Sequence, residues 1–334
     1  MNPNPILRQE LSAALSARGL PTHGFIGAAS LHRYVSRVEP RLRDAWGLDA
    51  MRGALVAALP YDPAKPAAMP GSQYGIIGAF AAAHHYAALA RLLKAAAADI
   101  SKSGAYARSD FRVAVNSPLP EKSLAVLAGL AFIGRSSLAI SDAYGPACVL
   151  GALFLPFDPL DIDAKAAADD RSAAFAPGAL CGACRACVDA CPVGAIAGPG
   201  ASEPGMARAR CIQHWASDAE SWRLPEELPP AVAAAWGSRL YGCDECVRAC
   251  PYLAGSFEPL HGKASPAASA AALLLAKEAR PGPCVDLNLL IAADEDALKR
   301  WKAGSALGFG WFGAHAIRRN ARMALLSYLE PFGI

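Results

Sequence analysis

Residues 181–192 read CGACRACVDACP, and residues 243–251 read CDECVRACP. The two runs contain seven of the ten cysteines, and Cys211 lies alone between them. In a C-x2-C-x2-C pattern three thiolates surround one face of an iron–sulfur cube, while the fourth cysteine, three residues on and followed by proline, reaches the other cluster. The spacing therefore predicts a ferredoxin-like segment that carries electrons through two [4Fe-4S] clusters.

Counting ligands assigns the cysteines to the two clusters. Two cubane clusters need eight thiolates, and Cys211 completes the seven that the runs supply. By the crossed-ligand rule, the first cluster is predicted to use Cys181, Cys184, Cys187 and Cys250. The second is predicted to use Cys191, Cys211, Cys243 and Cys246. Cys148 and Cys284 have no partner at ligand spacing, and we expect them to be buried bystander thiols.

Zinc and disulfide bonds are the alternatives for these cysteines. Zinc sites with four cysteines use paired C-x2-C elements, but they need neither a third cysteine at the same spacing nor a trailing Cys-Pro. Disulfides fit less well, because three thiols within seven residues pair badly and no secretory signal precedes them. Soft thiolates in this pattern favour iron–sulfur clusters.

Length and composition limit which further domains, partners and cellular location we expect for this chain. The chain has 334 residues, so residues 180–253 are less than a quarter of it and another part must use the electrons. A net charge of +3 does not demand a nucleic-acid partner. The sequence contains no run of eighteen apolar residues, so we do not expect a membrane span. Neither a signal peptide nor a twin-arginine leader is seen. We therefore expect a cytoplasmic protein, with a monomer favoured and an external low-potential electron donor.

Helix and strand patterns alternate before the cysteine-rich segment, which predicts an α/β (α+β) fold. The expected helices are 5–18, 77–100 and 121–131, and the expected strands are 24–29, 54–59, 111–115 and 148–155. An acidic, alanine-rich linker follows, and packed helices are expected toward the C-terminus. The expected domains are an α/β domain at 1–157, a double-cluster domain at 175–256 and a helical segment at 265–334 that packs on the other two.

These motifs together resemble the epoxyqueuosine reductases, the cobalamin-dependent iron–sulfur enzymes of queuosine tRNA modification. The similarity is strongest in the cysteine-rich segment, including RCI at 210–212 and YGCD at 241–244. It extends to EKSLAVLAGLAFIGRSSL at 121–138, VLG at 149–151 and RRNA at 318–321. The resemblance implies a cobalamin in the N-terminal domain, with its cobalt near one cluster, and tRNA carrying epoxyqueuosine as substrate. The cofactor rests on the resemblance alone, because the chain has no Asp-x-His-x-x-Gly motif.

The resemblance also implies site residues, and one of them departs from the family. Residues implied for cobalamin are Asn116, Gly134, Arg135, Ser136, Gln213, His214 and Asp244. The family's presumed general acid is an aspartate before the helix at 121–130, where this chain has Asn116. An amide cannot deliver a proton, so Glu121 is the candidate replacement, although a carboxylate at a helix N-terminus is also favoured by the helix dipole. A further departure is Ala152, where the family usually has Glu.

Three functions stay open on the sequence. The first is an oxidoreductase that passes electrons through two clusters to cobalamin and reduces epoxyqueuosine in tRNA. The second is a paralogue with the same cofactors and another substrate, motivated by Asn116. The third is an electron-transfer or corrinoid-reactivating protein without a substrate pocket. Arg318, Arg319 and Arg322 are compatible with an RNA backbone contact, but a solvated helix face is the commoner role for such a run.

Overall fold

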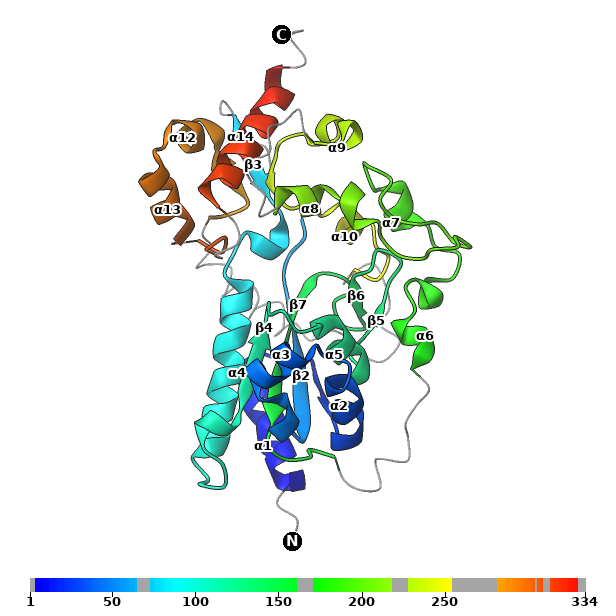
Figure 1. Cartoon of the computed structure of the whole chain (residues 1–334), viewed down its shortest axis with the longest axis vertical. Coiled ribbons are helices and arrows are strands. Elements are labelled where there is room, and N and C mark those ends of the chain that lie inside the picture. The colour runs from blue at the N-terminus through cyan, green and yellow to red at the C-terminus, as the bar shows by residue number, and fades with distance from the viewer. Residues whose placement is uncertain are drawn as a thin grey trace. The chain divides into compact units, whose positions relative to one another are not determined.

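The chain divides into two compact units that are interleaved in the sequence (Figure 1). The computed structural model describes residues 4–64, 73–160, 171–217, 228–253, 281–303, 305–308 and 313–329. Unit 1 consists of Met1–Pro60, Tyr86–Gly182 and Tyr252–Leu273, and unit 2 consists of Tyr61–His85, Ala183–Pro251 and Leu274–Ile334. The described residues 61–64 and 73–85 therefore belong with the cysteine-rich segment, although the sequence analysis placed them in the N-terminal domain.

Unit 1 is built on a four-stranded antiparallel sheet in the order β1-β2-β7-β4. The strands are β1 (His23–Ile26), β2 (Gly53–Pro60), β4 (Arg112–Val115) and β7 (Cys148–Leu155). The central strands β2 and β7 are apolar throughout and almost wholly buried, because helices cover both faces of the sheet. The expected strands at 24–29, 54–59, 111–115 and 148–155 are therefore confirmed to within a few residues.

The helices of unit 1 pack on both sides of this sheet (Figure 1). They are α1 (Asn4–Ala17), α2 (Ala28–Val35), α3 (Pro40–Trp46), α4 (His85–Ser101) and α5 (Glu121–Leu127), while a further short helix of unit 1, α6 (Ser172–Phe175), contacts α5. Helices α2 and α5 share one core with the sheet face that carries Val56 and Phe154. On the opposite face α4 comes so close that a Cβ at Gly151 would lie 2.9 Å from Leu89. A hairpin of β5 (Ala131–Ile133) and β6 (Ala139–Ser141) follows α5.

Unit 2 contains a three-stranded sheet and the cysteine-rich segment. The sheet runs in the order β8-β3-β9, from β8 (Arg239–Tyr241), β3 (Tyr74–Ile77) and β9 (Cys284–Asp286). Its helices are α7 (Ala186–Asp189), α8 (Ile212–Ala216), α9 (Pro230–Ala234), α10 (Glu245–Arg248), α12 (Leu287–Ala292), α13 (Glu295–Ala303) and α14 (Ala314–Leu329). The C-terminal helices expected from the sequence are present as α12, α13 and α14, while 265–280 lie outside the described residues.

Two expected helices are too long: the one at 77–100 by eight residues at its start, and the one at 121–131 by four residues at its end, because α5 ends at Leu127 and Ala131 already belongs to β5. The sequence pattern predicted a helix over 77–100, but α4 begins at His85, and Tyr74–Ile77 form strand β3 instead. The reason is tertiary: β3 pairs in parallel with β8 and antiparallel with β9, which lie far away in the sequence. No helix in the described part of the chain is long and apolar enough to span a membrane.

Candidate cluster-binding site

Two short helices bring the cysteine runs together in unit 2. Cys187 lies on α7 and Cys246 lies on α10, and these two helices contact each other. Cys211 immediately precedes α8, and Cys243 follows β8 by two residues. All ten cysteines are partly buried thiols. The fold therefore collects cysteines from three separate stretches of chain into one region.

The thiols predicted for the second cluster are electrostatic neighbours. Burial raises the pKa of Cys246, and the nearby Cys243, Cys211, Cys187 and Cys191 raise it further. Cys191, Cys211 and Cys243 also pack against one apolar core. Metal ligation needs deprotonated thiols, so iron binding must overcome this burial cost, and cluster assembly is coupled to proton release. Among the described residues no group of three or more His, Cys, Asp or Glu side chains has the arrangement of a metal site.

The core behind these thiols explains how they are positioned. It is formed by residues from the cysteine-rich segment together with Met323 of α14, and its largest buried side chain is Trp236. The backbone N–H of Ala195 donates to Sγ of Cys191 at 3.2 Å. Hydrogen bonds of this kind to cluster sulfurs are one of the means by which proteins set cluster potential.

The ligand set of the first predicted cluster divides between the units. Cys181 ends a short 3-10 helix (Ala179–Cys181) of unit 1, whereas Cys184, Cys187 and Cys250 belong to unit 2. This set therefore stays a prediction from spacing.

The two cysteines predicted to be bystanders lie on strands of the two sheets. Burial raises the pKa of Cys148 on β7 to about 12, and Cys284 lies on β9.

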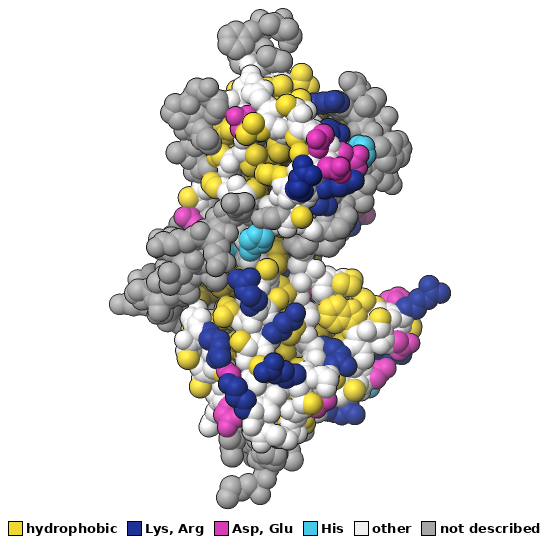
Figure 2. All heavy atoms as spheres, turned by 90° about the vertical axis from the view of Figure 1, so that its left-hand side faces the viewer, with side chains coloured by type: hydrophobic (Ala, Val, Ile, Leu, Met, Phe, Trp, Pro, Cys, Tyr) yellow, Lys and Arg dark blue, Asp and Glu magenta, His cyan; other side chains and the backbone are white. Residues whose placement is uncertain are grey.

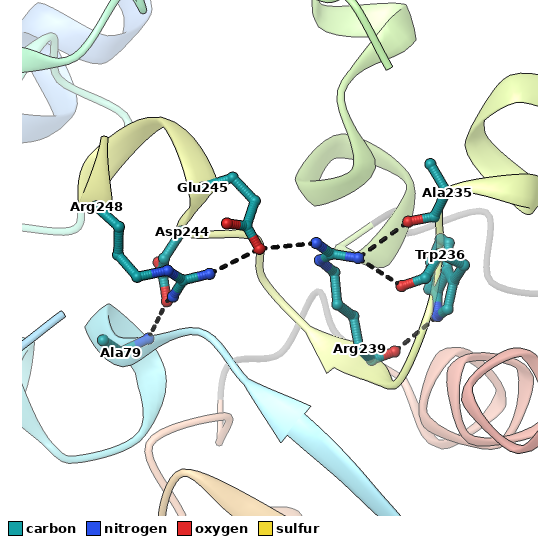
Figure 3. Close-up of polar contacts among 7 residues, drawn as sticks. All are labelled: Ala79, Ala235, Trp236, Arg239, Asp244, Glu245 and Arg248. Atoms are coloured by element: carbon teal, nitrogen blue, oxygen red, sulfur yellow. Dashed lines mark hydrogen bonds and ion pairs between the residues drawn. The ribbon is translucent and has the colours of Figure 1, made fainter. Parts of the chain in front are cut away.

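A chain of ion pairs adjoins the second cysteine run (Figure 3). Nη2 of Arg239 donates to Oε1 of Glu245 at 3.0 Å, and Nη2 of Arg248 donates to the same oxygen at 2.8 Å. Nη1 of Arg239 donates to the carbonyls of Ala235 at 2.9 Å and Trp236 at 2.8 Å. The indole N–H of Trp236 donates in turn to the Arg239 carbonyl at 2.6 Å. Sequence analysis missed these arginines, because no spacing rule marks an arginine that lies beside a cysteine run.

Asp244 is the most deeply buried charged side chain of this group. Its side chain is 5% exposed, and Oδ2 accepts the N–H of Ala79 at 2.7 Å. Oδ1 has no hydrogen-bond partner among the described residues. Burial raises the pKa of this carboxyl, while the Ala79 N–H and the Arg248 charge lower it. Asp244, predicted as a cofactor residue, therefore lies beside Cys243 with one buried acceptor atom available.

Gln213 and His214 occupy helix α8, directly after Cys211. Oε1 of Gln213 is buried without a partner among the described residues, while its amide donates to the hydroxyl of Tyr241. Nε of Arg208 donates to Nδ1 of His214 at 3.2 Å. Both predicted residues therefore lie in the same unit as Asp244 and the second-cluster thiols.

The remaining predicted residues lie in unit 1. Asn116 precedes α5 and Glu121 is its first residue, while Gly134, Arg135 and Ser136 lie between β5 and β6. Asn116 has a left-handed backbone with φ 51°. Oε1 of Glu121 accepts the backbone N–H of Ser117 at 2.8 Å, so the carboxylate closes the loop that Asn116 begins. Burial raises the pKa of Glu121, and the Ser117 hydrogen bonds oppose that shift. The hydroxyl of Tyr34 is buried without a partner among the described residues, and burial, followed by the nearby Glu121 charge, raises its pKa.

The loop between β5 and β6 carries Gly134, Arg135 and Ser136. A Cβ on Gly134 would lie 2.6 Å from Ile140, so glycine is required for the tight hairpin. Arg135 is 6% exposed, and Nη2 donates to the Gly182 carbonyl at 2.7 Å, next to Cys181. Arg135 is thus a buried structural side chain and not a solvated turn arginine, and a direct role in cofactor binding stays a prediction.

Helix α14 corrects a further expectation. Arg319 is buried and donates to the Trp215 carbonyl and to Oδ1 of Asn320. Nη2 of Arg318 donates to the carbonyl of Ala293 at the end of α12. Two of the three arginines are therefore held by the fold, and only Arg322 of the three is exposed. The basic run does not form the solvated helix face that its sequence suggests.

Comparison with known proteins agrees with the cysteine spacing. A family model described as a 4Fe-4S double cluster binding domain matches residues 180–253. An epoxyqueuosine reductase from Gloeobacter violaceus is 30% identical over 290 residues, which is 86% of this chain and 80% of that protein. One from Burkholderia pseudomallei is 36% identical over 137 residues, but the aligned part spans 31% of that protein, and one from Pseudomonas aeruginosa aligns over 38% of its own length.

Solved structures share the fold of the whole chain. A selenomethionine-labelled epoxyqueuosine reductase matches 98% of this chain and 83% of its own, with a TM-score of 0.68 and 22% identity. An epoxyqueuosine reductase with an epoxyqueuosine-modified tRNA-Tyr stem loop matches with a TM-score of 0.65 and 22% identity. The fold and the double-cluster domain define an iron–sulfur protein of the two-cluster class. Within that class, the chain belongs to the epoxyqueuosine reductase family.

Proposed function

We propose that this protein is an iron–sulfur oxidoreductase that passes electrons through two [4Fe-4S] clusters to a bound cobalamin and reduces epoxyqueuosine to queuosine in tRNA. The observation that carries the proposal is the gathering of Cys191, Cys211, Cys243 and Cys246 in one region of a chain that belongs to this family. The proposal includes the ligand sets inferred from spacing, a cytoplasmic location, an external low-potential electron donor and a monomeric protein.

The unpartnered acceptors of unit 2 support the cobalamin. Oδ1 of Asp244 and Oε1 of Gln213 are buried acceptors without donors among the described residues, and each lies close to a second-cluster cysteine in the chain. A buried acceptor is costly unless a donor reaches it, and a corrinoid carries many side-chain amide N–H groups. When bound, cobalamin supplies a cobalt that accepts electrons and becomes a strong reductant. Further residues proposed to hold it are Asn116, Gly134, Arg135, Ser136 and His214.

Basic side chains on unit 1 support tRNA as the partner. Figure 2 shows lysine and arginine side chains spread over the face that carries α4. Arg91 and Lys94 of α4 and Arg108 beyond it are exposed. Contacts between such basic side chains and backbone phosphates supply affinity for nucleic acid that does not depend on its sequence.

Glu121 is proposed as the general acid in place of the aspartate that the family has at Asn116. Burial raises its pKa, so at a given pH a larger fraction of the carboxyl is protonated and able to donate than for an exposed glutamate. Glu121→Gln should therefore lower turnover by about a hundred- to ten-thousand-fold. If Glu121 is the acid, Asn116→Asp should restore much of the activity in the Glu121→Gln background. If Glu121 only closes the loop through Ser117, the second substitution will not rescue.

Complementation tests the substrate. The gene is expressed in a queuosine-deficient strain that accumulates epoxyqueuosine, and tRNA nucleosides are analysed by mass spectrometry, with Cys211→Ala as the inactive control. Conversion to queuosine supports the proposal. Persistent epoxyqueuosine, together with intact clusters and corrinoid binding in the purified protein, would instead favour the paralogue with another substrate, which Asn116 motivates. Clusters that reduce a partner's corrinoid without any substrate turnover would favour the electron-transfer function.

A further inference from the structure

Four charged side chains share one pocket with the cluster ligand Cys243. The pocket has a volume of about 200 Å³ and is lined by Arg239, Asp244, Glu245 and Arg248 in addition to Cys243. The side chains of Arg239 and Arg248 are 18% and 24% exposed, and that of Glu245 is 32% exposed. Charges so far removed from water are weakly screened, so their positions decide the electrostatic field at the neighbouring thiolate.

Arg239 is held in place more firmly than the other three. One of its terminal nitrogens donates to two backbone carbonyls at the end of α9, and the other donates to Glu245 (Figure 3). Its own carbonyl accepts the indole N–H of Trp236, which is 1% exposed. The planar guanidinium satisfies all of these acceptors at once, which an ammonium group would not do. The positive charge of Arg239 is therefore fixed relative to the second cysteine run.

A fixed charge beside a cluster has a predictable effect on its chemistry. A [4Fe-4S] cluster gains one negative charge when it accepts one electron from an external donor, and no bond is formed or broken in that step. A nearby cation stabilises the reduced form and raises the reduction potential, and a nearby anion lowers it. Arg239 and Glu245 carry opposite charges and contact each other, so their effects should oppose each other in sign.

We propose that Arg239 is a positioning residue that raises the reduction potential of the second cluster, the one bound by Cys191, Cys211, Cys243 and Cys246, and that Glu245 lowers it. Glu245 also joins Arg248 to Arg239 and so links α10 to β8. The inference rests on the cluster assignment in the proposed function. It adds two residues that set the reduction potential of the second cluster and that the cysteine spacing does not reveal.

The test is an anaerobic potentiometric titration of the reconstituted full chain, followed by electron paramagnetic resonance, with dithionite as the electron donor. In Arg239→Gln one of the two midpoint potentials should fall by about 59 mV, so that the ratio of reduced to oxidised cluster at a fixed potential falls about tenfold. Glu245→Gln should move the same midpoint upward. Arg239→Lys keeps the charge and should shift the midpoint less than Arg239→Gln.

The matched control is Arg185→Gln, which removes an arginine next to the first-cluster ligand Cys184. Arg185 pairs with Asp189 in solvent, with side chains 54% and 61% exposed, so screening should leave both midpoints nearly unchanged. Equal shifts in the control and in Arg239→Gln, or shifts of the same sign in Arg239→Gln and Glu245→Gln, would overturn the inference.

Two further outcomes keep the inference separate from the proposed function. A wild-type chain that binds no iron contradicts the proposed function itself. If Arg239→Gln is the one variant that fails to retain the second cluster, its midpoint potential cannot be measured. The midpoint potential of Glu245→Gln then tests the inference, because that variant leaves both arginines in place. An unchanged or lowered midpoint in that variant overturns the inference, and a raised one supports it.

Discussion

Asn320 of α14 offers a quantitative test of how the cysteine-rich segment is held. Its side chain is 0% exposed, and its amide donates to the carbonyls of Ala216 and Leu240, each at 2.9 Å. Ala216 ends α8, which follows Cys211, and Leu240 lies on β8, which leads to Cys243. One amide thus ties together the two chain segments that carry second-cluster ligands.

The cost of Asn320→Ala follows from these contacts. The substitution leaves two buried carbonyl oxygens without their side-chain donor, at about 1–3 kcal/mol each, so the free energy of unfolding should fall by about 2–6 kcal/mol. That is a large share of the roughly 5–15 kcal/mol that a domain typically has. The matched control is Asn288→Ala, because the Asn288 amide is exposed and its contact with Gln73 is long, at 3.4 Å. Its effect should stay within about 0.5 kcal/mol.

Urea unfolding followed by circular dichroism measures the stability of both variants. A shift of the unfolding midpoint reports a change in the free energy of unfolding when the slope of that free energy against urea concentration is unchanged. The iron content of the reconstituted proteins provides a second reading, and Asn320→Ala should bind less iron than Asn288→Ala. If Asn320→Ala unfolds at the same urea concentration as the control, the buried amide does not hold these segments together and the reasoning fails.

Three further predictions concern iron, backbone strain and pH. Cys211→Ala should lower bound iron from about eight to about four atoms per chain, whereas Cys148→Ala should leave it unchanged in an iron assay. Gly145→Ala should lower the unfolding midpoint more than Gly104→Ala, because both have positive φ, but only at Gly145 would a Cβ lie 2.0 Å from a backbone oxygen. Burial raises the folded pKa of Glu121, so the folded state binds its proton more tightly, and wild type should lose stability relative to Glu121→Gln as pH rises from the ordinary glutamate pKa through the raised one. Thermal unfolding across that pH range measures this difference, and parallel curves would contradict it.

Local sequence patterns predicted the strands that carry a clear hydrophobic pattern of their own. Strands β2 and β7 are continuous apolar runs, and their bounds agree closely with the sequence prediction. The strands β3, β8 and β9 were missed, because each is stabilised by pairing with segments distant in the chain and not by a pattern of its own. The same partners explain why α4 begins at His85 and not at Ile77.

The sequence alone determined the double-cluster class and the ligand candidates, because the geometry of a cubane requires thiolates at short, regular spacings. Only the tertiary structure decided which polar side chains are buried and which charges face the cysteines. Arg319 and Arg135 have the sequence context of surface arginines, yet both are buried against backbone carbonyls. Arg239 lies beside Cys243 because β8, α9 and α10 fold together. Burial and electrostatic fields depend on neighbours in space, and those neighbours come from stretches of chain that no local pattern connects.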